Sequence, residues 1–300
     1  MRLIQHLGPG PSLRRTETTP TGLQGFTAAL APGQSLLDAV TAAFAAQGAT
    51  SGVARLHGGV FDPWPYVMPA LSRSLAHAVY FSERFEARGP IRLQEATITF
   101  GQRRDQRGEQ PWLHAHVDWL DATGQAHCGH VLPNEARLID GPARLEGWAL
   151  SGAGFAVQPD EETNFSLFRP VAAVPTSSAQ SAQAAQSGTA PALAVRVQPN
   201  RDLCEALESV CRAQGWRAAM VRGGVGSTVG VVFDDGRVVE PFVTETLIRH
   251  GVVAPGADGE LRADLDVMLV DHLGGRHQGR LARGQNAVLV TFELVLEGTS

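Results

Sequence analysis

Hydrophobic residues recur at every third or fourth position in two widely separated segments, a spacing that predicts one amphipathic helix in each. They are Leu36, Val40 and Phe44 in the first segment and Leu203, Leu207 and Val210 in the second. Ser35 and Asp202 precede these segments and suit the N-cap, whereas Gly48 and Gly215 follow them and suit the C-cap. The pattern therefore predicts two helices with matching ends.

Other segments alternate hydrophobic and polar residues, which is typical of antiparallel strands with one buried face. Clear examples are EATITF (95–100), LHAHVDWL (113–120) and NAVLVTFELVL (286–296). Such segments outnumber the helical ones in both halves of the chain. The predicted fold class is therefore α+β, dominated by sheet.

The two predicted helices belong to a longer internal repeat. APGQSLLDAVTAAFAAQGA (31–49) aligns with QPNRDLCEALESVCRAQGW (198–216), and residues 95–130 align with 245–280 without a gap. Self-similarity over this length is the signature of a duplicated structural unit. We expect two tandem copies of a compact, mainly antiparallel sheet domain with one principal helix each.

Composition sets the expected boundaries of these domains. Residues 1–22 are rich in Pro, Gly and Thr and suggest an extended or disordered arm, and residues 170–192 are rich in Ala, Ser, Gln and Pro, as flexible linkers are. The first domain would then span 23–169 and the second 193–300. In the first domain RLHGGV (55–60) predicts a strand that ends at paired glycines, with MVRGGV (220–225) as its counterpart.

Overall composition narrows the class of protein. The 300 residues are 43% hydrophobic and 18% charged, and no apolar run of about 18 residues predicts a membrane span. The start of the chain lacks the apolar core of a secretory signal, and three cysteines without C-x-x-C spacing fit a reducing compartment, so we expect the cytoplasm. The net charge of -5 gives no general attraction to nucleic acid.

Four histidines in WLHAHVDWLDATGQAHCGHVLPNE (112–135) carry the strongest chemical signal. His114 and His116 are two residues apart and share one face of a strand. A three-residue turn at 122–124 would place His116 opposite His130, while His127 would point to the other face with Trp119. Three convergent imidazoles predict a site for about one divalent transition metal per chain, with zinc expected first and iron, nickel or manganese as alternatives.

Two other interpretations of this hairpin stay open. Cys128 lies on the same face, opposite Asp118, and would complete a closed structural site, although a small residue is equally suited to packing there. The histidines could also form a cluster without metal. In the second copy Asp264, Asp266 and Arg280 occupy the three ligand positions. With Arg280 facing Asp266 as an internal cation, we expect no metal there, the alternative being a harder cation held by the two aspartates.

These motifs resemble the PCC or PPC domain, the plant and prokaryote conserved domain. The residues that carry the resemblance are Pro32-Gly33, Gly58-Gly59, His114-Ala115-His116, Asp121 with Gly124, and Cys128-Gly129-His130. The resemblance implies a compact α+β fold, assembly as a homotrimer, and kinship with acetolactate decarboxylase and a zinc-dependent ester hydrolase. The AT-hook core, Arg-Gly-Arg-Pro, through which plant relatives bind DNA, is absent from this sequence. Residues 140–168 lie outside the resemblance.

Two functions follow as hypotheses. The first is a metal-dependent enzyme, a hydrolase or lyase, acting on a small carbonyl, ester, lactone or carboxylate substrate. Asp118 and Glu135 would act as general base or orient a histidine, and His57 and Arg55 would anchor an acidic substrate. For all four, a solvated or structural role is the alternative.

The second hypothesis is a DNA-binding or regulatory module. Its support is the arginines of GGRHQGRLARG (274–284) and GQRRDQRGE (101–109). The alternative is that these segments are solvated hairpins whose arginines bind no DNA. The second domain could also serve as an assembly element or lid that completes the pocket of the first domain.

Overall fold

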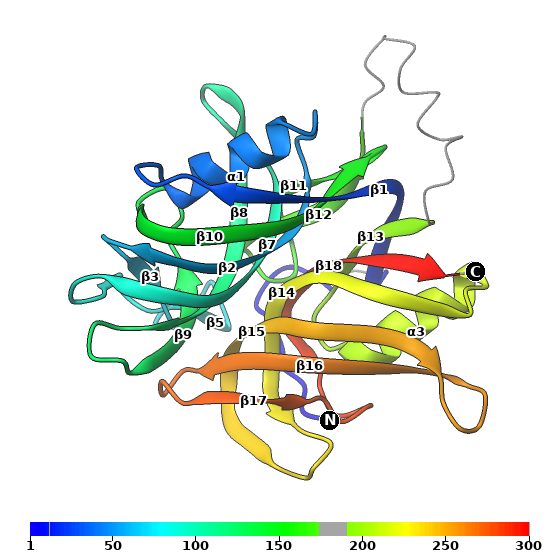
Figure 1. Cartoon of the computed structure of the whole chain (residues 1–300). Helices are drawn as coiled ribbons and strands as arrows, with labels where there is room; N and C mark the ends of the chain where they lie inside the picture. Colours follow the sequence, from blue (N-terminus) through cyan, green and yellow to red (C-terminus); the bar gives the residue numbers. More distant parts are fainter. Residues whose placement is uncertain (12, 174–190, 300) are drawn as a thin grey trace.

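The protein, described by a computed structural model for residues 1–11, 13–173 and 191–299, consists of two sheet-rich halves with one helix each among these residues (Figure 1). The elements of the first half are β1 (Thr16–Leu30), α1 (Leu36–Ala45), β2 (Gly52–Phe61), β3 (Pro65–Val67), β4 (Pro69–Leu71), β5 (Val79–Phe81), β6 (Phe85–Glu86), β7 (Ile91–Asp105), β8 (Gly108–Leu120), β9 (Ala126–Val131), β10 (Leu138–Ser151), β11 (Ala153–Pro159) and β12 (Ser166–Ala172). Those of the second half are β13 (Ala192–Val197), α3 (Leu203–Gln214), β14 (Ala218–Val232), β15 (Val238–Pro255), β16 (Leu261–Asp271), β17 (Arg276–Arg280) and β18 (Val288–Thr299). The predicted α+β class is confirmed.

The two halves have the same topology. The order of neighbouring strands is β1-β10-β2-β7-β8-β9 in the first half and β13-β18-β14-β15-β16-β17 in the second, with antiparallel pairing throughout both series. In each of these two series the first strand is followed by the strand latest in the chain, and the others succeed in chain order. One fold is therefore used twice, as the repeat predicts.

The first strand joins the halves into one sheet. Residues 16–21 of β1 pair with β13, and residues 22–30 pair with β10. The boundary expected at residue 22 therefore lies inside a strand. The preceding residues contact the second half: the Ile4 N–H donates to Asn200 Oδ1 at 2.8 Å, and the buried His6 ring donates to the Leu289 carbonyl.

Both predicted helices are present and capped. The Ser35 hydroxyl accepts from the Asp38 N–H at 3.1 Å, and the Asp202 carboxylate accepts from the Glu205 N–H at 2.9 Å. Gly215 ends α3 in the left-handed conformation, as expected, but α1 is capped at Ala46, two residues before the predicted glycine. The apolar stripes of both helices are buried against the sheets, each large side chain contributing roughly 1.5–3 kcal/mol to stability.

Paired glycines bend two long strands without ending them, contrary to the sequence prediction. β2 continues through Gly58 and Gly59 to Phe61, and β14 continues through Gly223 and Gly224. All four glycines have positive φ, which allows the backbone to turn while pairing resumes beyond them. At Gly223 a Cβ atom would lie 2.6 Å from Val53 of the first half, so this glycine also permits close approach of the halves.

Residues 140–168, which lie outside the family resemblance, contribute to one strand that belongs to the repeat and to two strands that do not. β10 is the last strand of the first repeat, equivalent to β18, whereas β11 and β12 form an additional hairpin beside β7. Most of the predicted linker, residues 174–190, lies outside the described residues. Its ends do not: β12 extends to Ala172, and β13 begins at Ala192.

Apolar and ionic contacts hold the halves together. Cys128 of the first half is buried in a cluster with Leu247, Met268 and Val270 of the second. Beside it, the Arg276 guanidinium donates two hydrogen bonds to the Asp118 carboxylate, at 2.7 and 2.9 Å.

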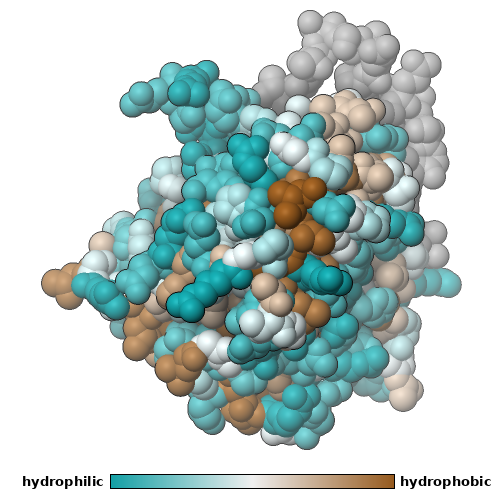
Figure 2. All heavy atoms as spheres, turned by 60° about the vertical axis from the view of Figure 1, so that its left-hand side comes forward, coloured by the Kyte–Doolittle hydropathy of each residue, from teal (hydrophilic) through white to brown (hydrophobic). Residues whose placement is uncertain are grey.

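The face seen in Figure 2 is mostly hydrophilic, with apolar residues in small groups. No helix among the described residues has the length and apolar character needed to cross a membrane.

The ion pair between Arg276 and Asp118 predicts a measurable effect on stability. Arg276→Ala should lower the free energy of unfolding by about 1–3 kcal/mol, because Asp118 is only 8% exposed and would lose its cation. Arg280→Ala is the matched control, since the side chains of Arg280 and its partner Asp264 are 59% and 41% exposed and such pairs contribute about 0–1 kcal/mol. Urea unfolding measures both, and equal effects would contradict the prediction.

Candidate metal centre

The hairpin of β8 and β9 brings three histidines together as the sequence predicts. The Asp121 N–H donates to the Gln125 carbonyl, and Gly124 has a φ of 84°, so the turn is the expected one. His116 lies directly opposite His130. The ring centroids of the three imidazoles are 4.7 Å (His114–His116), 4.9 Å (His114–His130) and 5.4 Å (His116–His130) apart.

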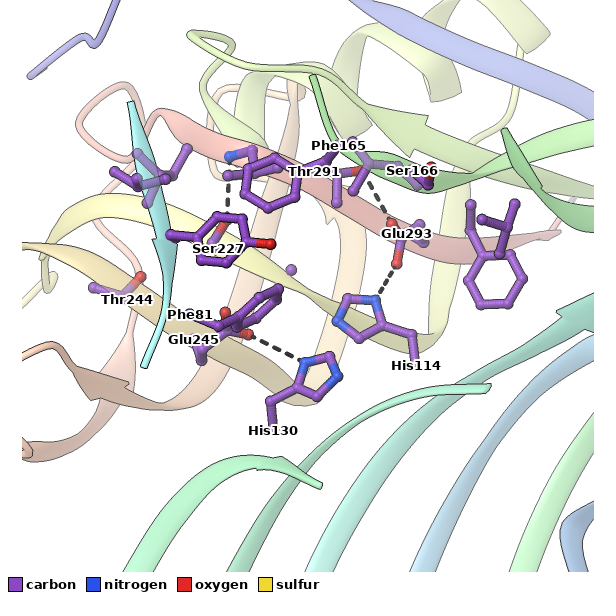
Figure 3. Close-up of a pocket in the computed structure, with 18 of the residues that line it drawn as sticks. Phe81, His114, His130, Phe165, Ser166, Ser227, Thr244, Glu245, Thr291 and Glu293 are labelled. Carbon is purple, nitrogen blue, oxygen red and sulfur yellow. Dashed lines mark hydrogen bonds and ion pairs between the residues drawn. The ribbon is translucent and has the colours of Figure 1, made fainter. Parts of the chain in front are cut away.

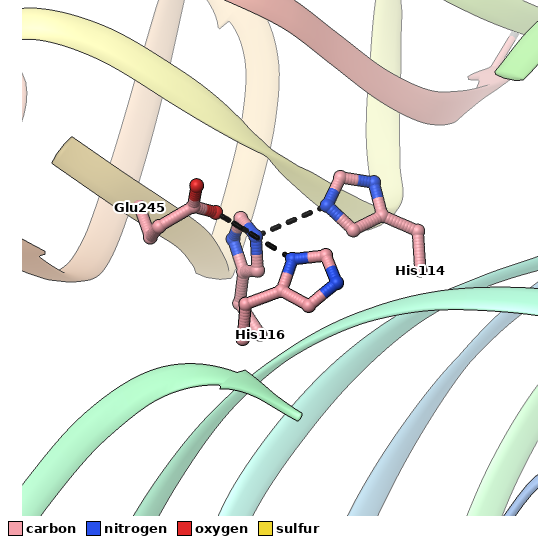
Figure 4. Close-up of side chains that lie close together, drawn as sticks. His114, His116 and Glu245 are labelled. Carbon is pink, nitrogen blue, oxygen red and sulfur yellow. Dashed lines mark hydrogen bonds and ion pairs between the residues drawn. The ribbon is translucent and has the colours of Figure 1, made fainter. Parts of the chain in front are cut away.

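A carboxylate of the second domain completes the cluster. Glu245, on β15, directs its side chain at the histidines, and one possible ligand atom from each of the four residues lies within 4.8 Å of the others (Figure 4). Glu245 Oε2 contacts His116 Nε2 and lies 3.9 Å from His130 Nδ1. The cluster is therefore shared between the two domains.

Two further contacts with the second domain determine how the rings are oriented. His114 Nδ1 is 2.8 Å from Glu293 Oε2, a contact marked by a dashed line in Figure 3. His116 Nδ1 donates to the Thr246 carbonyl at 2.8 Å. With each Nδ1 directed at an acceptor, Nε2 is the ring nitrogen left to bind a cation. These Nε2 atoms face each other at 3.1 Å, so a proton or a metal ion between them would hold them together.

The pKa values of the cluster follow from burial and from mutual contacts. Burial lowers the pKa of His130 to about 4, so its ring is neutral at pH 7. Burial also disfavours protonation of His114, but the Glu293 carboxylate outweighs it and raises the pKa of His114 above its usual value. Burial alone would raise the pKa of Glu245, but His116 and His130 hold it well below its usual range. Glu245 is therefore ionised.

These residues fit a divalent transition metal. Neutral imidazoles and a carboxylate are the donors that zinc and related ions prefer. The buried Nδ1 atom of His130 has no hydrogen-bond partner among the described residues, and a metal ligand needs none. Outer contacts such as those of Glu293 and Thr246 are the usual way to fix the orientation of ligating histidines.

The cluster opens onto a cavity of about 260 Å³ between the domains (Figure 3). His114, His130, Glu245 and Glu293 form part of its wall. The other lining residues are mostly apolar or aromatic, and they come from both domains and from the β11–β12 hairpin. A small molecule in this cavity would lie against the candidate ligands.

The other residues proposed from the sequence are not among those that line the cavity. Asp118 is engaged by Arg276, and the half-exposed Glu135 pairs with Arg84 at 2.9 Å. His57 is exposed, on a strand position opposite Arg144. Arg55 is partly buried opposite Glu146.

The fourth histidine of the hairpin has a scaffold position, as expected. The ring of His127 stacks on Trp119 at 5.7 Å and contacts the Asp121 carboxylate at 3.0 Å. The second copy repeats this contact with His277 and Asp271, 2.8 Å apart. Each contact stabilises the turn of its own hairpin, and the contact of His127 lies away from the cluster of His114, His116 and His130.

The equivalent face of the second copy holds ion pairs. Arg280 lies opposite Asp266, as predicted, but its guanidinium donates to Asp264 at 2.7 Å. Asp266 is 3.8 Å from Arg249, which also contacts Glu95 of the first domain at 3.4 Å. Two guanidinium groups therefore offset the charge of the carboxylates on this face.

Sequence reasoning missed Glu245 and Glu293, which contribute the carboxylates of the site. Each is the one acidic residue of an otherwise uncharged segment within its strand, FVTETLI and VLVTFELVL. A carboxylate in such a strand is rarely buried without a partner. That signal could have marked both as functional candidates, although it could not have identified the histidines as their partners.

Comparison with known proteins finds similarity among solved structures. No family model matches the chain, and no curated protein matches it. A plant- and prokaryote-conserved (PPC) protein of Pyrococcus horikoshii is 15% identical, with a TM-score of 0.39, over 52% of this chain and 96% of its own. A metal-containing protein of Archaeoglobus fulgidus is 17% identical, with a TM-score of 0.38, over 49% of this chain and 93% of its own.

A candidate DNA-binding protein of Bacteroides thetaiotaomicron is 13% identical, with a TM-score of 0.36, over 50% of this chain and 98% of its own. The chain is similar to PPC proteins. The resemblance inferred from its motifs is confirmed to that extent, and each solved chain corresponds to about half of this one.

The contact between Glu293 and His114 predicts an effect on metal affinity. Glu293→Gln should weaken zinc binding by about 10–100-fold, because the amide is a poorer acceptor for the His114 N–H. Glu297→Gln, on the same strand but paired with Arg222, is the control and should leave affinity unchanged. Competition with a chromophoric chelator measures both, and an unaltered affinity in Glu293→Gln would contradict the assigned role.

Proposed function

We propose that the protein is a metal-dependent enzyme that acts on a small carbonyl, ester, lactone or carboxylate compound. The observation that carries this proposal is that the cluster of three histidines and Glu245 places His114, His130 and Glu245 in the wall of a cavity between the domains. A cluster that served only to hold the structure together would need no cavity beside it. Ligand cavities of enzymes combine apolar walls with a few convergent polar groups, as this one does.

In this proposal His114, His116 and His130 would hold a divalent transition metal, with zinc expected first, and Glu245 would lie beside the position left open for a substrate oxygen. Such an ion polarises a carbonyl oxygen and lowers the pKa of water. Glu293 holds His114 in the tautomer that leaves Nε2 available. The Ser227 hydroxyl accepts from the Val290 N–H, which leaves its own hydrogen for a substrate oxygen. Asp118, Glu135, His57 and Arg55 receive no catalytic role, because they lie outside the cavity wall.

The proposal predicts that zinc-loaded protein converts a member of a panel of esters, lactones and keto acids. Purified protein should contain about one transition metal per chain, and His116→Ala should lose both metal and activity. His127→Ala removes a histidine of the same hairpin that lies outside the cluster and should keep both. Elemental analysis and product detection make the measurement. A metal content that His116→Ala does not change would sink the proposal.

A second candidate function is DNA binding, favoured by the description of the Bacteroides thetaiotaomicron protein. The structure bears on where such binding would occur. In the segment 274–284, Arg276, Arg280 and Arg283 all form ion pairs with carboxylates. The exposed arginines of the β7–β8 hairpin are the better candidates: Arg103, Arg104 and Arg107.

If DNA binding is the function, replacing Arg104 and Arg107 by Ala should weaken binding to duplex DNA and reduce its dependence on salt. Each lost phosphate contact should lower the slope of log K against log salt by about 0.9. Arg262→Ala is the control, because this partly exposed arginine of the second domain is already paired with Asp258. Fluorescence anisotropy at several salt concentrations measures the affinity for duplex DNA and its salt dependence. Weak binding that does not change when Arg104 and Arg107 are replaced would rule out DNA binding as the function.

A further inference from the structure

We propose that the substrate of this cavity is a carbonyl compound with an apolar substituent of about the size of a phenyl ring. The carbonyl oxygen would lie at the histidines and the substituent between the aromatic walls. This inference rests on the proposed function and specifies its substrate class.

Aromatic rings form a wall that leads to the histidine cluster. The Phe81 ring lies 5.1 Å from that of His130 and 6.2 Å from that of Phe165. The Phe165 ring stacks on Tyr80, with the ring centroids 5.6 Å apart. Trp112 and Phe168 also line the cavity. Aromatic walls of this kind bind flat apolar groups through offset and edge-to-face contacts.

The second domain provides an aliphatic wall. Its apolar lining residues are Val243, Leu289 and Val290. Several polar side chains of the cavity are already engaged: Glu293 binds His114 and the Thr291 hydroxyl, Glu245 contacts His116, and the Arg103 guanidinium lies over the Trp112 ring at 3.9 Å. A polar substituent beyond the carbonyl head would lose its hydrogen bonds to water against these walls, which disfavours sugars and short hydroxy acids as substrates.

The volume of the cavity agrees with a ring-sized group. An apolar cavity of roughly 150 Å³ accommodates benzene. The cavity between the domains of this protein has a volume of about 260 Å³. It therefore has room for one ring and a head group of a few atoms.

Two hydroxamates that differ only in their substituent test the inference. Both present the same metal-binding head, acetohydroxamate with a methyl group and benzohydroxamate with a phenyl ring. Isothermal calorimetry with zinc-loaded and metal-free protein measures their affinities without any assumption about the reaction. Benzohydroxamate should bind zinc-loaded protein about 10–100-fold more tightly than acetohydroxamate, from the apolar area that the ring buries.

A variant of the aromatic wall locates the effect. Phe165→Ala should weaken benzohydroxamate binding about fivefold to tenfold and leave acetohydroxamate unchanged. Phe85→Ala is the matched control, because its ring packs on Tyr66 and lies outside this cavity. Thermal unfolding of both variants checks that they are folded. If a variant does not fold, the comparison of the two hydroxamates on the unaltered protein still tests the inference.

The possible results distinguish the proposed substrate class from the proposed metal-dependent function on which it rests. Tighter binding of the phenyl compound that depends on Phe165 supports the substrate class. Equal, zinc-dependent binding of both hydroxamates overturns the substrate class and leaves the metal site in place. Binding that zinc does not improve for either compound overturns the proposed function, and this inference with it.

Discussion

The hydrogen bond from His116 to the Thr246 carbonyl is the contact on which the site depends. His116 is fully buried, and this bond directs its Nε2 atom toward His114 and Glu245. Its acceptor belongs to the backbone of β15, the strand that also carries Glu245. Docking of the second domain therefore sets the orientation of one imidazole and supplies the carboxylate in a single step. Without that docking, the first domain would present three histidines but no acidic partner.

The two copies share a fold but contribute different chemistry. The first provides imidazoles, which are neutral donors, and the second provides the carboxylates of Glu245 and Glu293. A bound dication would then be attracted to both domains and would strengthen their association, because a ligand that binds only the docked form stabilises it. The pocket has the same dual origin, so neither domain alone could form the site.

Much of the fold could be read from the sequence, because helix caps, strand alternation and the repeat are local signals. The register of His116 against His130 followed from the turn at 122–124 alone. Glu245 could not be placed in this way. The gap-free alignment pairs Glu245 with Glu95, but the two glutamates have different neighbours across the sheet. Glu95 lies opposite Asp118 on β8, and the aligned counterpart of Asp118 is Met268. Glu245 instead lies opposite Val270 on β16, two positions beyond Met268. Bulges in β7 and β15 shift the strands, and no local pattern reveals that shift.

Fusion of the two copies in one chain explains how this asymmetry can persist. In a symmetric assembly of identical chains, each copy would have to carry the histidines and also the acidic residues that meet them. Here each copy is free to lose one set. The histidine positions of the second copy hold Asp264, Asp266 and Arg280, and the ion pairs of Arg280 and Arg249 offset the charges left on that face. The second domain retains the fold because β13 must pair with β1 and β15 must present Glu245. Both requirements constrain its backbone and its strand register. They do not constrain the residues at the three positions that correspond to the histidines of the first domain.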